Sequence, residues 1–214
     1  MDEDTSIIDS KTRNEKIKNF LLANKKNLIS LILFLIFMII GFYSYQIYRD
    51  GVREQISNKY NNAVIEYQIG NKSETIMSLK DLINEEDSTY SPLALYFIID
   101  NNLIEEKEEI NKLFDILIDK TSLENEIKNL IIYKKALFNA DQVDEIKLLK
   151  ILNPVINSES VWKSHALYLV AEFFYSKGEI QKSKDFFQKI VSNENSNSEI
   201  AISAQRRLNR DLSD

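Results

Sequence analysis

Residues 27–48 read NLISLILFLIFMIIGFYSYQIY, a stretch of 22 residues without a charged side chain. A helix of about 20 such residues crosses the ~30 Å hydrocarbon core of a bilayer, because each residue adds ~1.5 Å and the helix satisfies its own backbone polar groups. The alternative is a buried helix of a soluble domain. Charged residues normally interrupt such helices every three or four positions, as they do elsewhere in this chain. The stretch therefore predicts one transmembrane helix.

The residues on either side of this helix predict its orientation. Six basic residues precede it: Lys11, Arg13, Lys16, Lys18, Lys25 and Lys26. Only Arg49 and Arg53 follow it closely. Basic residues stay on the cytoplasmic side of a membrane. We therefore expect residues 1–26 to be a cytoplasmic tail and residues 49–214 to form a domain on the far side.

The far end of the apolar stretch predicts that it is retained as an uncleaved signal anchor. Residues 41–45 read GFYSY and are too bulky for the small-residue site at which signal peptides are cleaved. The stretch is also longer than the apolar region of a typical signal peptide. Tyr43, Tyr45 and Tyr48 gather where aromatic rings prefer the headgroup layer.

Composition predicts a helical domain after the membrane segment. The chain has 214 residues, of which 44% are hydrophobic and 28% charged, enough for one domain with a core. Four Gly and two Pro give little of the turn chemistry that a many-stranded sheet needs. The net charge of -6 argues against nucleic acid as a partner. The absence of cysteine excludes a disulfide framework and a thiol nucleophile.

Short amphipathic blocks separated by polar breaks predict nine helices in the domain. We expect them at residues 52–68, 73–84, 92–100, 105–119, 121–139, 142–152, 160–177, 180–191 and 196–210. Thr121 with Glu124 and Ser196 with Glu199 have the spacing of capping boxes, which predicts that they begin helices. Pro154 is expected to end the sixth helix.

The predicted turns within successive helix pairs recur at a nearly constant interval. They fall at Gly70, Asn102, Ala140 and Gly178, which are 32, 38 and 38 residues apart. Periods near 34 are typical of tetratricopeptide repeats, in which each helix pair must stack on its neighbours to bury its apolar face. The predicted fold class is therefore all-α, with a single transmembrane helix followed by a tetratricopeptide-repeat-like α-solenoid of about nine helices.

The last pair fits this repeat best. Ala171 is expected where the two helices cross closely, with Phe174 and Phe187 filling the groove between them. Ile180 and Ile190 are expected to supply the next layer of the core. Small and large side chains that interlock in this way are what stacked helix pairs require.

The same pair carries a resemblance to a known family. Residues 161–174 read VWKSHALYLVAEFF, followed by KGE at 177–179 and SKDFF at 183–187. Together they resemble the last repeat of the ancillary SecYEG translocon subunit family, with Ser183 in place of the usual Ala. Residues 90–94, YSPLA, are similar to an earlier helix start of that family. The resemblance implies a bacterial inner-membrane protein with a periplasmic domain that associates with the translocon, chaperones or exported clients.

Catalytic and metal-binding patterns are weak throughout the sequence. His165 is the only histidine, and its aromatic-rich helix favours a packing role over a role as ligand or base. Glu105, Glu106, Glu108 and Glu109 lack the ligand spacing of a calcium loop and predict a solvated first turn. No Gly-rich phosphate loop can be assembled. We expect no enzyme activity, cofactor or metal.

Aromatic side chains gather in the last repeat and predict the partner-binding residues. Neighbouring helical residues point about 100° apart, so Phe173 and Phe174 cannot both face one seam, nor can Phe186 and Phe187. One ring of each pair is therefore left over from the seam. These two spare rings either pack on the ninth helix or line a concave binding face between the third and seventh helices. The candidates for partner binding are Trp162, Tyr168, Phe173 and Phe186.

These patterns favour a protein-binding adaptor over two alternatives. One is a structural organiser of envelope or cell-division complexes, which would use the same fold with other partners. The other is a membrane-tethered enzyme, which lacks a visible set of titratable groups. Arg206, Arg207 and Arg210 predict a polar cap on the last helix. We therefore expect a monomer or weak dimer.

Overall fold

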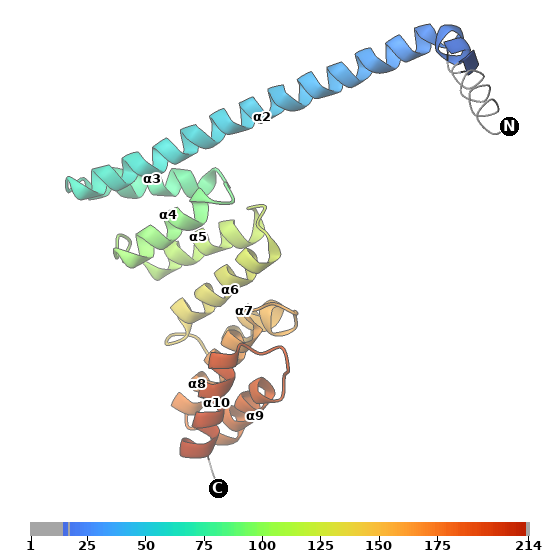
Figure 1. Ribbon diagram of the computed structural model, residues 1–214. Helices are drawn as coiled ribbons and strands as arrows, with labels where there is room; N and C mark the ends of the chain where they lie inside the picture. Colours follow the sequence, from blue (N-terminus) through green and yellow to red (C-terminus); the bar gives the residue numbers. More distant parts are fainter. Residues whose placement is uncertain (1–14, 17, 213–214) are drawn as a thin grey trace, which may run out of the picture. The chain divides into compact units, whose positions relative to one another are not determined.

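The computed structural model describes residues 15–16 and 18–212, and every regular element among them is a helix (Figure 1). This confirms the predicted all-α fold class. Lys11 and Arg13 of the predicted tail lie outside the described residues. From Lys25 onward the helices are α2 Lys25–Gln68, α3 Lys72–Asn84, α4 Tyr90–Asp100, α5 Lys107–Asp119, α6 Asn125–Asn139, α7 Glu145–Ile156, α8 Lys163–Ser176, α9 Ile180–Val191 and α10 Ser198–Asp211.

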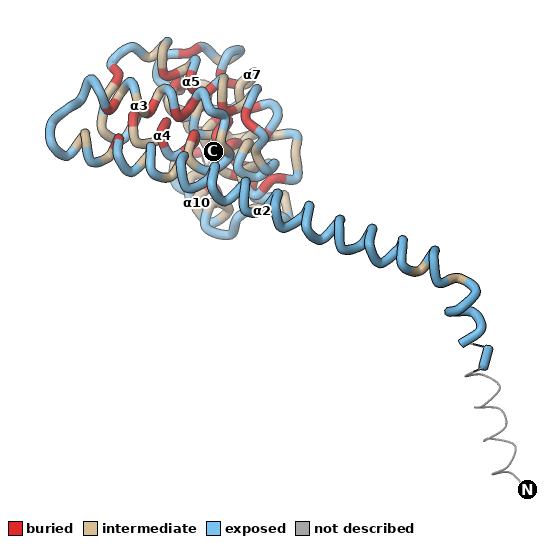
Figure 2. The backbone as a smooth tube through the Cα atoms, turned by 90° about the horizontal axis from the view of Figure 1, so that it is seen from above, coloured by how far each residue is buried: buried red, intermediate tan, exposed pale blue. Residues whose placement is uncertain are grey.

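Helix α2 contains both the charge-free stretch and the first expected helix of the domain. We expected that helix to begin at Val52, but α2 continues through Gly51 without a break. A glycine inside a helix costs only about 1 kcal/mol relative to alanine, which is too little to end a helix supported on both sides. Residues 27–48 are almost entirely exposed (Figure 2), and α2 is long and apolar enough to cross a membrane.

The chain divides within α2 into two compact units, Met1–Gln55 and Ile56–Asp214. In the second unit each helix from α3 onward packs on the next one. Contacts also join α3 to α5, α6 to α8 and α8 to α10. Contacts to the next helix and the next but one are typical of stacked helix pairs.

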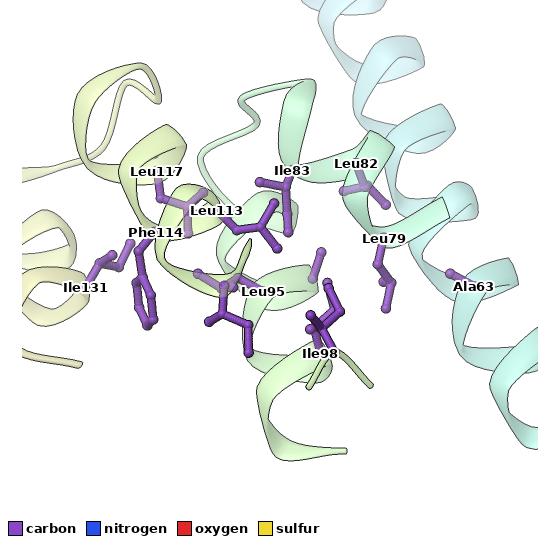
Figure 3. Close-up of a cluster of buried hydrophobic side chains, with 13 residues drawn as sticks. Ala63, Leu79, Leu82, Ile83, Leu95, Ile98, Leu113, Phe114, Leu117 and Ile131 are labelled. Atoms are coloured by element: carbon purple, nitrogen blue, oxygen red, sulfur yellow. The ribbon is translucent and has the colours of Figure 1, made fainter. Parts of the chain in front are cut away.

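The core of the second unit consists of three clusters that are each shared by neighbouring helices. The first extends from Ala63 near the end of α2 to Ile131 of α6 (Figure 3). The second joins residues of α6, α7 and α8, including Leu152. The third joins α8, α9 and α10 around Phe187 and Ala204. Helices α6 and α8 each contribute to two of the clusters, so they join successive parts of the core.

Three of the four predicted turns close their helices through a residue with positive φ. Gly70, Asn102 and Gly178 have φ of 90°, 49° and 76°. In each case the backbone amide of the next residue donates a hydrogen bond to the carbonyl of the residue five positions before it. These bonds run from Asn71 to Glu66 at 2.9 Å, from Leu103 to Ile98 at 3.0 Å and from Glu179 to Phe174 at 2.9 Å. This is the Schellman motif. The helix ends predicted at Gly70 and Gly178 are confirmed.

Both predicted capping boxes are wrong. Helix α6 begins at Asn125 after Glu124, while Thr121 is buried and its hydroxyl points to a carbonyl of the preceding helix. Helix α10 begins after Asn197, whose side chain accepts hydrogen bonds from the backbone amides of Glu199 and Ile200. Asparagine is as good an N-cap residue as serine, and Asn197 directly precedes the first residue of α10, so Asn197 and not Ser196 is the N-cap.

The sixth predicted helix is also shifted. Helix α7 begins at Glu145 because the side chain of Asp144 accepts a hydrogen bond of 2.8 Å from the Lys147 amide. It continues past Pro154 to Ile156, so the predicted stop at this proline is wrong. A proline this close to the end removes one helical hydrogen bond, and the buried side chain of Val155 holds the last turn on the core.

The predicted burial of the last pair is confirmed except at one residue, but Phe174 and Phe187 lie in different core clusters and do not fill one groove together. Ala171, Phe174, Phe187 and Ile190 are buried, as expected. Ile180 is 46% exposed and does not belong to the core layer assigned to it. It is the first residue of α9, where the chain has only just left the turn at Gly178.

Candidate functional site

An open groove of about 740 Å³ lies among α5, α6 and α7. This volume is in the range of sites that take small molecules or a few side chains of a partner. Its apolar lining includes Ile118 of α5, Ile132 of α6, Val143 of the α6–α7 turn and Ile151 of α7. These residues belong to the second core cluster or pack against it, so the groove opens directly on the core.

A pair of asparagines joins α5 to α6 at the groove. The amide nitrogen of Asn111 donates to the side-chain oxygen of Asn139 at 2.9 Å, and Asn139 donates back at 2.8 Å. Each amide also donates to a carbonyl one turn earlier in its own helix. All four donors are satisfied, so the pair fixes α5 against α6 and leaves only oxygen lone pairs for a ligand.

Five lysines line the groove: Lys107, Lys112, Lys135, Lys147 and Lys150. Lys135 forms an ion pair with Asp115 across α5 and α6. The ammonium of Lys107 lies 5.4 Å from the centre of the Phe138 ring. For the other three lysines, the structure records no ion pair with any residue that it describes.

The lining carries more positive than negative charge. Its carboxylates are Glu108, Asp115 and Asp119, so the five lysines exceed them by two. The whole chain, by contrast, carries a net charge of -6. Lys112 comes from α5, whereas Lys147 and Lys150 come from α7, so positive charge is presented from two walls. The arrangement suits an anionic, partly apolar ligand.

The structure places Trp162 in a packed aromatic group. Its ring stacks on Tyr133 of α6 with centroids 5.9 Å apart, and His165 lies 5.1 Å from it. Burial raises the pKa of Tyr133. His165 also meets Tyr133 edge to face, and its buried Nδ1 has no hydrogen-bond partner among the described residues. These contacts agree with the packing role expected for His165.

Tyr168 of α8 packs against the third core cluster, whereas Trp162 packs against the second. The Tyr168 ring meets Phe187 edge to face at 5.3 Å. Burial raises the pKa of Tyr168, and the neighbouring Glu172 carboxylate raises it further. Tyr168 and Trp162 therefore belong to different core clusters, with no contact between them recorded in the described part of the chain.

Phe173 and Phe186 are the two spare rings of the last repeat. Phe173 is 7% exposed and lies edge to face with Phe174 at 5.8 Å. Phe186 stacks on Phe174 at 5.6 Å, and the Lys189 ammonium lies 4.3 Å from its centre. Phe186 of α9 thus packs on α8, whereas Phe173 belongs to the second core cluster, which α8 shares with α6 and α7. Partner binding by the four predicted aromatic residues stays a prediction.

An ion-pair network ties α10 to α8. Arg207 donates two hydrogen bonds of 2.7 Å to the Glu172 carboxylate, and it also pairs with Asp211. Its guanidinium lies 4.3 Å from the centre of the Tyr175 ring. Arg210 also pairs with Asp211, and the two arginines lower the pKa of this carboxylate to about 2. Two of the three predicted cap arginines therefore make specific bonds.

The acidic run before α5 behaves as a helix start. Glu106 is the N-cap residue of α5, and Glu108 and Glu109 lie in its first turn, where negative charge is favourable. Glu109 also pairs with Lys80 of α3. Among the described residues, no group of three or more carboxylate or histidine side chains is arranged to hold a metal ion.

The groove lysines and the asparagine pair were not singled out from the sequence. Comparisons with protein-family models, with curated proteins and with solved structures found no match for this chain.

Proposed function

We propose that this protein is a membrane-anchored, protein-binding adaptor. The observation that carries the proposal is the combination, in one chain, of an exposed, charge-free stretch of α2 at residues 27–48 with a domain in which each helix packs on the next. Stacks of helix pairs offer extended surfaces that bind proteins. An anchor of this length restricts that binding to the vicinity of a bilayer.

The proposed architecture of the domain is a tetratricopeptide-like solenoid. The turn spacing of 32, 38 and 38 residues supports it, as do the Schellman turns at three of the four positions. The contacts between α6 and α8 and between α8 and α10 also agree with such a stack. On this proposal the domain binds protein segments on its surface, and neither nucleic acid nor a cofactor is required.

We further propose that residues 1–26 are cytoplasmic and that the domain faces the periplasm of a bacterium. Lys25 and Lys26 directly before the span and the tyrosines at its far end support this orientation. Because the chain has no cysteine, Ser10→Cys and Ser192→Cys would each introduce a single thiol. A membrane-impermeant maleimide should label only the Ser192→Cys variant in spheroplasts. Labelling of the Ser10→Cys variant alone would reverse the orientation.

The proposed partners are subunits of the Sec translocon together with chaperones or exported clients. The resemblance of residues 161–187 to the ancillary translocon subunit family supports this choice. The test is affinity purification of the full chain from gently solubilised membranes, followed by identification of the co-eluting proteins. Translocon subunits would support the proposal, whereas cell-division or envelope proteins would favour the structural organiser. Retention of neither group would argue against an adaptor.

A further inference from the structure

We propose that the groove among α5, α6 and α7 binds a protein segment in which acidic side chains alternate with apolar ones. This inference rests on the proposed adaptor function and names the chemistry of the partner. Two features of the groove carry it: its apolar floor, and an excess of lysine on its walls.

The floor provides the apolar half of the recognition. Ile132 and Val143 are nearly buried in the second core cluster, and Ile118 and Ile151 lie at its edge. An apolar side chain placed in the groove would be removed from water against these residues. Burial of one such side chain contributes about 1.5–3 kcal/mol before the costs of binding are subtracted.

The walls provide the charged half. Lys112 on α5 and Lys147 and Lys150 on α7 have no ion pair among the described residues, so each can bind a carboxylate of a partner. Residues three apart in a helix share a face, so Lys147 and Lys150 point the same way. A segment between α5 and α7 would be flanked by ammonium groups on both sides.

A continuous polyanion fits this groove less well than an acidic peptide does. Glu108 and Asp119 also line it, and they would repel a regular row of phosphates. The net excess of two positive charges is small compared with what nucleic acid binding requires. A peptide can place its carboxylates beside the lysines and keep them away from the two acidic residues.

The test measures binding of a short fluorescent peptide, in which glutamate and leucine alternate in pairs, to the full chain in detergent micelles. The groove variant is Lys147→Glu with Lys150→Glu. The matched control is Lys72→Glu with Lys134→Glu, which makes the same change of charge at exposed lysines outside the groove lining. Circular dichroism verifies that both variants keep the helical content of the wild type.

We expect the groove variant to bind the peptide about tenfold more weakly, because attraction becomes repulsion at two positions. The control should bind as the wild type does, and a peptide with lysine in place of glutamate should not bind. Equal binding to the groove variant and the wild type would overturn the proposal, as would no binding at all. Stronger binding of oligonucleotides or of anionic lipid vesicles at the same lysines would also overturn it.

A second measurement separates this inference from the adaptor function. The partners that co-purify with the wild-type chain from membranes are compared with those retained by the groove variant. If both chains retain the same proteins, the adaptor function stands and the groove is not the binding site. If only the groove variant loses them, both proposals are supported. If the wild-type chain retains none, the adaptor function itself fails, whatever the peptide shows.

Discussion

The two parts of α2 share one continuous backbone and differ in what surrounds their side chains. Residues 27–48 are exposed and carry no charge, whereas the part after Gln55 contributes Ile56, Tyr60 and Ala63 to the first core cluster. Tyr60 meets Tyr90 at 5.8 Å and Phe97 at 6.4 Å. Both parts are helical, so helix formation does not distinguish them. The spacing of charged residues does, because it determines whether a part of the helix is stable in lipid or in water.

The energetic consequence follows from the same comparison. A large apolar side chain left in water gives up about 1.5–3 kcal/mol relative to a buried one. The first part of α2 exposes a continuous series of such side chains, including Phe34, Phe37 and Ile47. The second part alternates them with charges such as Lys59 and Glu66, which remain in water. We therefore expect lipid around the first part only.

The largest expected effect comes from placing charge in the first part. Ile32→Arg with Ile36→Arg should remove the chain from the membrane, because each arginine costs about 2.5–3.5 kcal/mol at the centre of a span. The matched control is Ile65→Arg with Ile69→Arg, which has the same spacing at exposed positions, with Ile65 near the end of α2 and Ile69 in the turn that follows it. The control chain should stay in the membrane. Resistance to alkaline extraction is the measurement, and equal behaviour of the two variants would break the comparison.

A truncation in the core should have the next largest effect. Phe187 is 0% exposed, and Phe187→Ala should lower the free energy of unfolding by about 3–5 kcal/mol, because it leaves a cavity at the α8–α9 seam. Phe37 is 77% exposed in the first part of α2, and Phe37→Ala should leave the unfolding of the domain unchanged. Urea unfolding of the detergent-solubilised chain, followed by circular dichroism, measures both. A similar loss in the two variants would contradict this assignment.

Glycine should matter in a turn of the domain and not inside α2. Gly178 has φ of 76° and no atom near its missing side chain, so Gly178→Ala acts through the backbone alone. The strain should destabilise the domain by about 1–2 kcal/mol. Gly51 lies inside α2 and is equally free of neighbouring atoms, so Gly51→Ala should cause no loss. Thermal unfolding of both variants tests the difference.

The apolar helix, the helical fold class and most helix positions could be predicted from the sequence. These features depend on local patterns, such as the charge-free run at residues 27–48 and the glycines at 70 and 178. Several of the errors at helix ends concerned competition between neighbouring residues. Asn197 caps α10 although Ser196 has the better motif, and Pro154 is accommodated near a helix end because Val155 is buried.

The candidate groove could not be predicted, because it depends on how separate helices meet. Asn111 and Asn139 are 28 residues apart, and neither sequence context indicates that they pair. Lys147 and Lys150 look like ordinary solvated positions of an amphipathic helix until α5 is placed beside them. Sequence reasoning instead selected large aromatic side chains, whose packing on the core is equally compatible with their spacing.

Two buried serines in the domain should respond in opposite directions to the same change. Ser183 has a buried hydroxyl without a partner among the described residues, so Ser183→Ala should raise the free energy of unfolding by about 1 kcal/mol. Ser91 is equally buried, but its hydroxyl donates a 2.8 Å hydrogen bond to the Leu82 carbonyl. Ser91→Ala should lower the free energy by about 1–2 kcal/mol. Equal signs in urea unfolding would show that the Ser183 hydroxyl has a partner.

The smallest expected effect is a loss of domain stability at acid pH. Residues 27–48 contain no carboxylate and cannot contribute to it. Arg210 and Arg207 lower the pKa of Asp211 from 3.8 to about 2, so the folded state holds its charged form more firmly than the unfolded chain does. The resulting stability is present above pH 4 and is lost as the pH falls towards 2. Asp211→Asn removes this contribution at every pH. The difference in thermal midpoint between the wild type and Asp211→Asn should therefore narrow over that interval, and a constant difference would mean that the network does not hold α10 in solution.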